Sequence, residues 1–327
     1  MGQHGAIQPL TRRLIKYSVC RVFTTVNIRH ATINILAGAS SIPRSIPAAI
    51  FFAAFLAAAC STAAQDNPSN AVPPQPAAQI QSSTGVLTAV PNRPTFSTTA
   101  EAVQRGVFEI EYGFEAADGH QNINGLLKFG LFKNLELRFG NNPIERDSGV
   151  AGRGDSFAGF KYRLFEEKKK RPTIALLYAA LLPTATANLG IGALGHSATI
   201  LVSQDFGKHH FDFNWGSQWL SRQGAAGFDR SYFTALAYSH PASGKWGVTG
   251  EIAGYSRANA TTPATMTTMG AATYTMKSRL VLDGGAYLAA YGNLPRVTFF
   301  SGVTYSVGDL YRELRSRQTH PAHSPDF

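Results

Sequence analysis

Charged side chains alternate with apolar ones along several stretches of this chain, and they are the residues with the most evident chemistry. Glu109 and Glu111 are separated by a single apolar residue, and Lys161 and Arg163 follow the same spacing. Side chains two positions apart in a β-strand point to the same face. We therefore expect one face of a sheet to gather charges of both signs, namely Glu109, Glu111, Lys128, Glu136, Arg138, Asp155, Lys161, Arg163, Asp212, Glu251 and Asp283.

Two of these carboxylates, Glu251 and Asp283, stand alone on otherwise apolar stretches. A buried carboxylate without a partner is costly. The sequence therefore predicts that Arg138, Lys161 or Arg163 faces one of them. Charges of both signs on one inner face can pair into a lattice that supports the structure, or they can rank passing solutes by charge.

A metal site is the next chemistry to consider, at His209, His210 and Asp212. His210 and Asp212 share a strand face, but two ligands without a third are too few for a metal centre. The two histidines are interpreted as part of a polar turn. The sequence predicts no metal and no cofactor.

Nucleophilic catalysis needs a serine or cysteine beside a base that a third group orients. Ser203, Ser217 and Ser239 have no recognisable flanking signature for this arrangement. The glycine-rich stretch 188–195 lacks the lysine and the following helix of a phosphate-binding loop, and is interpreted as a surface loop. The chain is therefore not predicted to be an enzyme.

Strands must position these charges, because apolar and polar residues alternate with period two in twelve stretches. Connections after the second, fourth, sixth, eighth and tenth stretches are short and polar, whereas those after the third, fifth, seventh and ninth are longer. This layout is typical of an up-and-down antiparallel sheet with tight turns at one end. The stretches are residues 107–114, 122–131, 135–140, 156–165, 173–182, 196–206, 210–220, 231–239, 246–255, 269–276, 280–288 and 297–307.

Aromatic content and low charge indicate the environment of this sheet. Charged residues make up only 15% of the chain, and all but six of the 12 Tyr, 21 Phe and 3 Trp lie after position 104. Outer-membrane barrels carry aromatic residues at both interfaces, and strands that cross lipid must close so that every backbone group is paired. The sequence predicts an all-β, transmembrane, up-and-down antiparallel barrel of about 12 strands over residues 105–307. A soluble sandwich is the alternative.

The apolar run 46–59 behind Arg44, followed by small residues up to Ala64, is typical of a Sec signal peptide. We expect residues 1–64 to be an N-terminal extension and signal peptide, with lipoprotein processing at Cys60 as an alternative. This segment holds six basic and no acidic residues. The net charge of +10 thus falls to +4 for the remainder, 24 Lys and Arg against 20 Asp and Glu, which argues against a nucleic-acid-binding protein.

Two further segments flank the predicted barrel. Residues 65–104 are rich in Pro, Ala, Ser and Gln with almost no charge, so we expect a disordered, extended linker. Residues 308–327 are expected to be a polar C-terminal tail. Outer-membrane barrels usually end on an aromatic residue of the last strand, whereas Phe327 lies far beyond Val307 and is interpreted as a coincidence.

Two stretches resemble a known family. Residues 152–176 (GRGDSFAGFKYRLFEEKKKRPTIAL) resemble its G-x-G-D…G-x-K-Y-R strand and turn. Residues 272–307 resemble its closing three strands, with an L-x-L-D-x-G strand, a Pro-containing loop and a G-x-[ST]-Y strand. The family is the one of outer-membrane transporter-like barrels labelled for the MetA pathway of phenol degradation. The resemblance, over about residues 100–307, implies a channel or transporter for aromatic or other hydrophobic compounds and implies no catalytic residue.

These observations predict a bacterial outer-membrane channel in which small solutes diffuse through a charged lumen. All the charges named first, except Asp155, are candidates for selectivity. The expected partners are outer-membrane lipid, a small-molecule solute and the barrel-assembly machinery, and nucleic acid is not expected. A closed barrel for structure, adhesion or partner binding is the second hypothesis, and an outer-membrane lipid hydrolase is the third.

Overall fold

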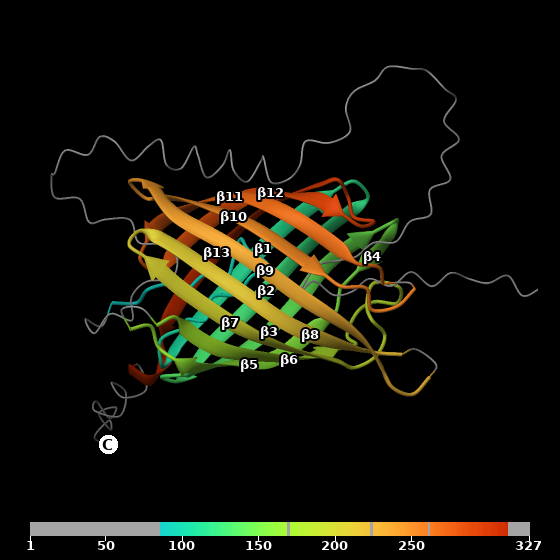
Figure 1. Ribbon diagram of the computed structural model, residues 1–327, viewed down its shortest axis with the longest axis horizontal. Helices are drawn as coiled ribbons and strands as arrows, with labels where there is room; N and C mark the ends of the chain where they lie inside the picture. Colours follow the sequence, from blue (N-terminus) through green and yellow to red (C-terminus); the bar gives the residue numbers. More distant parts are fainter. Residues whose placement is uncertain (1–85, 169–170, 223–224, 261, 313–327) are drawn as a thin grey trace, which may run out of the picture.

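The computed structural model describes residues 86–168, 171–222, 225–260 and 262–312. These residues form one antiparallel sheet, which Figure 1 shows as a closed barrel of tilted strands. The expected signal peptide and the tail beyond residue 312 lie outside the described residues. The strands are β1 (Val107–Ala117), β2 (His120–Phe132), β3 (Leu135–Asp147), β4 (Val150–Gly152), β5 (Ser156–Phe165), β6 (Thr173–Leu182), β7 (Gly195–Phe206), β8 (His209–Ser221), β9 (Phe228–Ser243), β10 (Trp246–Tyr255), β11 (Thr265–Lys277), β12 (Leu280–Tyr291) and β13 (Val297–Asp309).

The barrel closes because β1 pairs with both β2 and β13. The remaining wall strands pair with their neighbours in chain order, and β3 pairs with β2 and β5. The short β4 pairs only with the last residues of β3 within the described sheet. Closure removes the unpaired edges that an open sheet would expose. The predicted closed antiparallel barrel is therefore confirmed, with twelve strands in the wall and β4 added to it.

The bounds predicted from the sequence agree with the observed strands to different extents. The strands β5, β6 and β10 match the ranges predicted from the sequence to the residue. Strand β3 differs, because it was predicted to end at residue 140 and continues to Asp147. The run Asn141-Asn142-Pro143 suggested a loop, but pairing with β2 on one side and β4 on the other keeps this stretch extended. No helix in the described residues is long and apolar enough to cross a membrane.

The two ends of the barrel differ in their connections (Figure 1). Strand β1 begins and β13 ends at the end where the connections are tight, which we call the turn end. The opposite end, which we call the loop end, carries β4 and the longer connections. Both ends of the wall thus lie on one side, as in outer-membrane barrels whose short turns face the periplasm.

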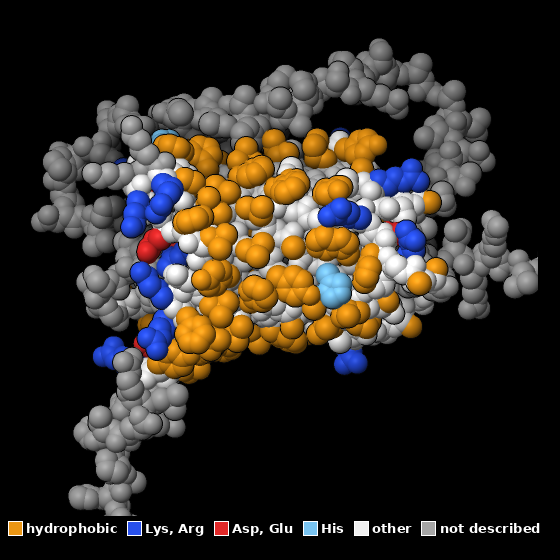
Figure 2. All heavy atoms as spheres, turned by 60° about the horizontal axis from the view of Figure 1, so that its bottom comes forward, with side chains coloured by type: hydrophobic (Ala, Val, Ile, Leu, Met, Phe, Trp, Pro, Cys, Tyr) orange, Lys and Arg blue, Asp and Glu red, His pale blue; other side chains and the backbone are white. Residues whose placement is uncertain are grey.

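The outer and inner faces of the wall have opposite chemistry. Large apolar side chains such as Trp215 and Phe299 are 50% and 66% exposed on the outside, and Figure 2 shows a band of them between charged ends. Charged side chains such as Glu109 and Lys128 are fully buried on the inside. An apolar exterior around a charged interior reverses the pattern of soluble proteins. The soluble-sandwich alternative is therefore wrong.

Candidate functional site

The lumen is occupied by residues 86–104, which we call the lumen segment. It has no regular secondary structure, yet Ser97, Ala100 and Val103 are at most 1% exposed. The structure thus differs from the linker expected over 65–104. Residues 65–85 lie outside the described part of the chain, but 86–104 are packed against the inner wall. Residues 86–104 contain too few apolar side chains to form a core of their own, so their packing contacts come from the inner wall.

The lumen segment makes one circuit of the inner wall. Followed backward from residue 104, it bonds in turn to β3, to β5 and β6, to β7, β8, β10 and β12, and finally to β1 and β2. It finishes at the turn end, where the Ala89 N–H donates to the Ser278 carbonyl over 2.8 Å. The segment therefore contacts most of the wall instead of lying along one side.

Main-chain N–H groups of the lumen segment end on side-chain oxygens of the wall. An extended segment outside a sheet needs such acceptors, because buried N–H groups are otherwise unsatisfied. Ionised acceptors make the strongest bonds of this kind. The donors and acceptors are Val90 to Glu109 (2.9 Å), Asn92 to Glu111 (2.9 Å), Phe96 and Ser97 to Glu251 (2.8 and 2.6 Å), Thr98 to Asn214 (2.7 Å), Ala100 to Ser203 (2.7 Å) and Val103 to Glu136 (2.9 Å).

The prediction that a wall cation faces Glu251 is wrong. Its carboxylate receives two N–H groups of the lumen segment, which offset its burial without a second charge. The three candidate cations pair elsewhere: Arg138 and Lys161 with Glu136 (3.2 and 3.3 Å), and Arg163 with Glu101 of the lumen segment (2.6 Å).

Two buried lysines join wall carboxylates to the lumen segment. The Lys128 ammonium lies 2.5 Å from Glu109, also contacts Glu111, and donates to the Val90 carbonyl over 2.5 Å. Lys161 donates to two carbonyl groups of the segment in the same way. A buried ammonium is tolerated only where such partners replace its water. The segment is therefore part of the electrostatic balance of the lumen.

Asp283 pairs with Arg93 of the lumen segment. The prediction that a wall cation faces Asp283 is therefore also wrong. The Arg93 guanidinium lies 3.3 Å from the carboxylate and donates to Asn124 over 2.7 Å. Gly113 and Gly302 make room for it, because a Cβ atom there would lie 2.1 and 2.2 Å from guanidinium atoms. Two wall strands thus accommodate a side chain that the segment brings.

His210 lies inside the barrel, so the prediction that it belongs to a polar turn is wrong. It is 3% exposed and contacts Asp205 (2.6 Å) and Asp212 (3.0 Å), while the turn is made by the two residues before His209. Ser203 donates to the same Asp212 over 2.5 Å. A catalytic triad would place the histidine between the serine and the acid, and here the acid lies between them. Within the described ranges, no group of three or more His, Cys, Asp or Glu is arranged to hold a metal ion.

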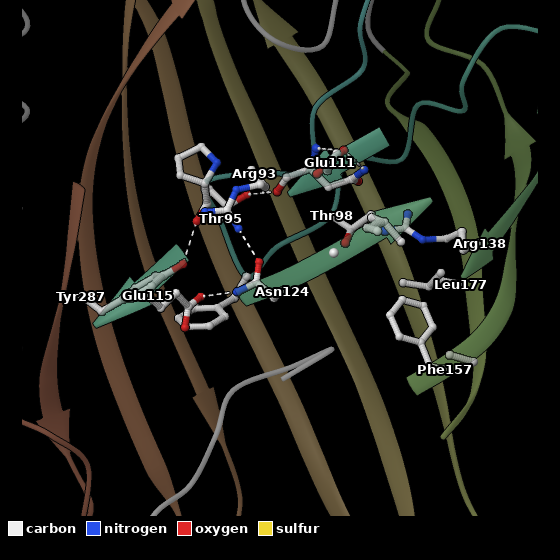
Figure 3. Close-up of a pocket in the computed structure, with 16 residues that line it drawn as sticks. Arg93, Thr95, Thr98, Glu111, Glu115, Asn124, Arg138, Phe157, Leu177 and Tyr287 are labelled. Atoms are coloured by element: carbon white, nitrogen blue, oxygen red, sulfur yellow. Dashed lines mark hydrogen bonds between the residues drawn. The ribbon is translucent and has the colours of Figure 1, made fainter. Parts of the chain in front are cut away.

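A cavity of about 110 Å³ lies between the lumen segment and the wall (Figure 3). Arg93 and Asn124 line one part of it, and the ring of Phe157 lines another. Phe96 of the segment stacks on Tyr287 of β12 with ring centroids 4.4 Å apart. The cavity therefore combines hydrogen-bonding groups with apolar surface and is bounded on one side by the segment.

Asp155 lies at the loop end, outside the strands. It accepts N–H groups from Ala185 (2.9 Å) and Ile191 (2.6 Å) and so holds the connection between β6 and β7. Burial raises the pKa of its carboxyl above the ordinary value, against the opposing effect of those N–H groups. Its role in the structure is to hold a loop.

The structure places all ten selectivity candidates on the inner face and buried. Sequence reasoning missed their principal partner, the lumen segment. One signal was available, because six acids (Glu109, Glu111, Glu136, Asp212, Glu251 and Asp283) face only four bases (Lys128, Arg138, Lys161 and Arg163). The excess of acceptors implies donors from elsewhere, and the N–H groups of the segment and Arg93 provide them.

No family model matches the chain, and neither does any curated protein. Among solved structures, the NanC porin has a TM-score of 0.48 at 10% identity, over 61% of this chain and all of that one. An outer membrane channel from Pseudomonas putida F1 has a TM-score of 0.48 at 15% identity, over 63% and 97%. The CymD monoaromatic hydrocarbon channel has a TM-score of 0.37 at 9% identity, over 64% and 90%. These likenesses assign neither a family nor a solute, so the resemblance found in the sequence stays a prediction.

Proposed function

We propose that this chain is a bacterial outer-membrane barrel that conducts small solutes, and that the lumen segment controls its opening. One observation carries the proposal: the wall is apolar outside and ionised inside around a closed strand circuit. Such a wall is compatible with the lipid core, because a closed barrel pairs the backbone groups of its strands with one another. We also propose that the barrel-assembly machinery inserts it, as for other barrels of this membrane.

The charged inner face of the barrel supports conduction, because a purely apolar interior would not favour the passage of polar solutes. The buried carboxylates of the inner wall lie on β1, β3, β8, β10 and β12, and its buried cations lie on β2, β3 and β5. Charged side chains that line a pore bias the passage of charged solutes. The ten inner charges would therefore set selectivity once the lumen is open. In the observed state several of them bind the lumen segment instead.

We infer that the observed state is closed. A water-filled passage would expose the lumen segment along its length, but its residues from Ser97 to Val103 are mostly buried. Conduction therefore requires the segment to shift. Its attachment by many separate hydrogen bonds makes partial detachment from one stretch of wall feasible without loss of the barrel.

The cavity in Figure 3 favours small solutes that combine a polar group with an apolar body. Arg93 and Asn124 offer donors, while Leu126 and Phe157 offer apolar contact. A volume of about 110 Å³ admits only a few non-hydrogen atoms. Larger solutes would have to displace the segment.

Planar-bilayer conductance tests this function. Protein extracted from membranes should give rare or small steps that scale with salt, and a variant lacking residues 86–104 should give frequent larger steps. Heat-dependent migration on gels confirms that the variant is folded. Silence from both folded proteins would contradict a channel.

A closed structural or partner-binding barrel is the second candidate, favoured by the burial of the lumen segment itself. The deletion variant separates the two functions. If the wild-type protein never conducts and the deletion only lowers stability, the segment is structural filling.

A further inference from the structure

Every tight turn at the turn end presents exposed cations. The turns joining β2 to β3, β5 to β6, β7 to β8, β9 to β10 and β11 to β12 each hold at least one. Because the turns are spaced around the barrel, the cations encircle it. We call this set the turn ring: Lys133, Lys168, Arg171, Lys208, Lys245, Lys277 and Arg279.

The turn ring lies directly beside aromatic side chains of the outer wall. Arg171 stands over the ring of Phe165 at 5.5 Å, and Arg279 stands over Tyr305 at 5.3 Å. Trp246 follows Lys245 in sequence and is 53% exposed. Aromatic residues of this kind mark the boundary between hydrocarbon and headgroups. The cations beyond them therefore lie at the depth of lipid phosphates.

Few carboxylates neutralise the turn ring. Lys133 contacts Glu166 at 3.4 Å. Within the residues that the structure describes, no ion pair holds Lys208, Lys245, Lys277 or Arg279. Their charges are therefore available to an external anion.

We propose that the turn ring binds the phosphate groups of anionic phospholipids in the leaflet that faces the turn end. The proposal rests on the proposed membrane-spanning barrel. The arrangement favours lipid over a protein partner, because the cations surround the wall next to its apolar band instead of clustering on one side. Basic residues near a membrane surface attract anionic lipids, and salt weakens the attraction.

Spin-labelled lipids test the proposal. The membrane-extracted protein is reconstituted in phosphatidylcholine, and the fraction of immobilised probe is compared for labelled phosphatidylglycerol and labelled phosphatidylcholine. We expect a several-fold preference for phosphatidylglycerol at low salt, declining as salt is raised. Exchange of Lys208, Lys245, Lys277 and Arg279 for Gln should abolish most of it.

A matched control removes four exposed arginines from the loop end by exchange for Gln: Arg146, Arg153, Arg257 and Arg296. This control should keep the preference. Equal immobilisation of both probes, or equal loss in the two quadruple variants, would overturn the turn-ring proposal. Absence of any immobilised lipid would instead contradict the membrane-spanning barrel, so the two failures are distinguishable.

Discussion

Arg93 shows how a single side chain joins the lumen segment to the wall. It comes from a stretch whose composition resembles a linker, and its carboxylate partner lies 190 positions later in the chain. Nothing near Arg93 in the sequence indicates this pairing. Gly113 and Gly302 leave space for its guanidinium. The sequence does not show why glycine is needed at these two strand positions, because the side chain that fills the space comes from a distant part of the chain.

Arg93→Ala should destabilise the barrel, because it leaves the 2% exposed carboxylate of Asp283 without its cation. Breaking a buried ion pair on one side typically costs about 3–5 kcal/mol. Urea unfolding in detergent micelles, followed by tryptophan fluorescence, measures the loss. The double variant Arg93→Ala with Asp283→Asn should recover much of it, since the unpaired charge is then absent. A double variant as unstable as the single one would show that the ion pair is not the cause.

The wall strands and the lumen segment differ in how far local sequence specifies them. Strands such as β5 and β10 alternate so regularly that pattern alone gives their bounds. The inner charges follow from the same alternation. The lumen segment has no period, and its structure comes from acceptors on distant strands. The sequence pattern therefore predicts the charged inner wall that binds the lumen segment, but it does not predict the packing of the segment itself.

Fixing the lumen segment to the wall should lock the closed state. The Ala100 N–H lies 2.7 Å from the Ser203 Oγ, which brings the two Cα atoms within about 7 Å, near the range of a disulfide. Ala100→Cys with Ser203→Cys should therefore suppress conductance steps when oxidised and regain them with a reductant. Each single cysteine variant serves as the control. Unchanged steps in the oxidised protein would mean that solutes pass without movement of this stretch.

The whole molecule should behave as a closed barrel in lipid. We expect it to fractionate with the outer membrane and to migrate faster on gels unheated than after boiling, because a wall with all its backbone bonds internal resists detergent. Variants of the turn ring should keep this shift, since their side chains lie outside the wall. Recovery in the soluble periplasm without a shift would contradict both the location and the proposed function.

The circuit of the lumen segment also has a consequence for the order of assembly. Its partners extend from Glu111 on β1 to Ser301 on β13, whose carbonyl accepts from Arg93 over 3.3 Å, so its full set of bonds exists only once the first and last strands have met. The segment precedes the barrel in the chain and so leaves the ribosome earlier, yet it reaches its final place last. Complete packing of the lumen segment therefore indicates a completely assembled barrel. A barrel with a missing or misaligned strand would leave part of the segment unbound and accessible to proteases.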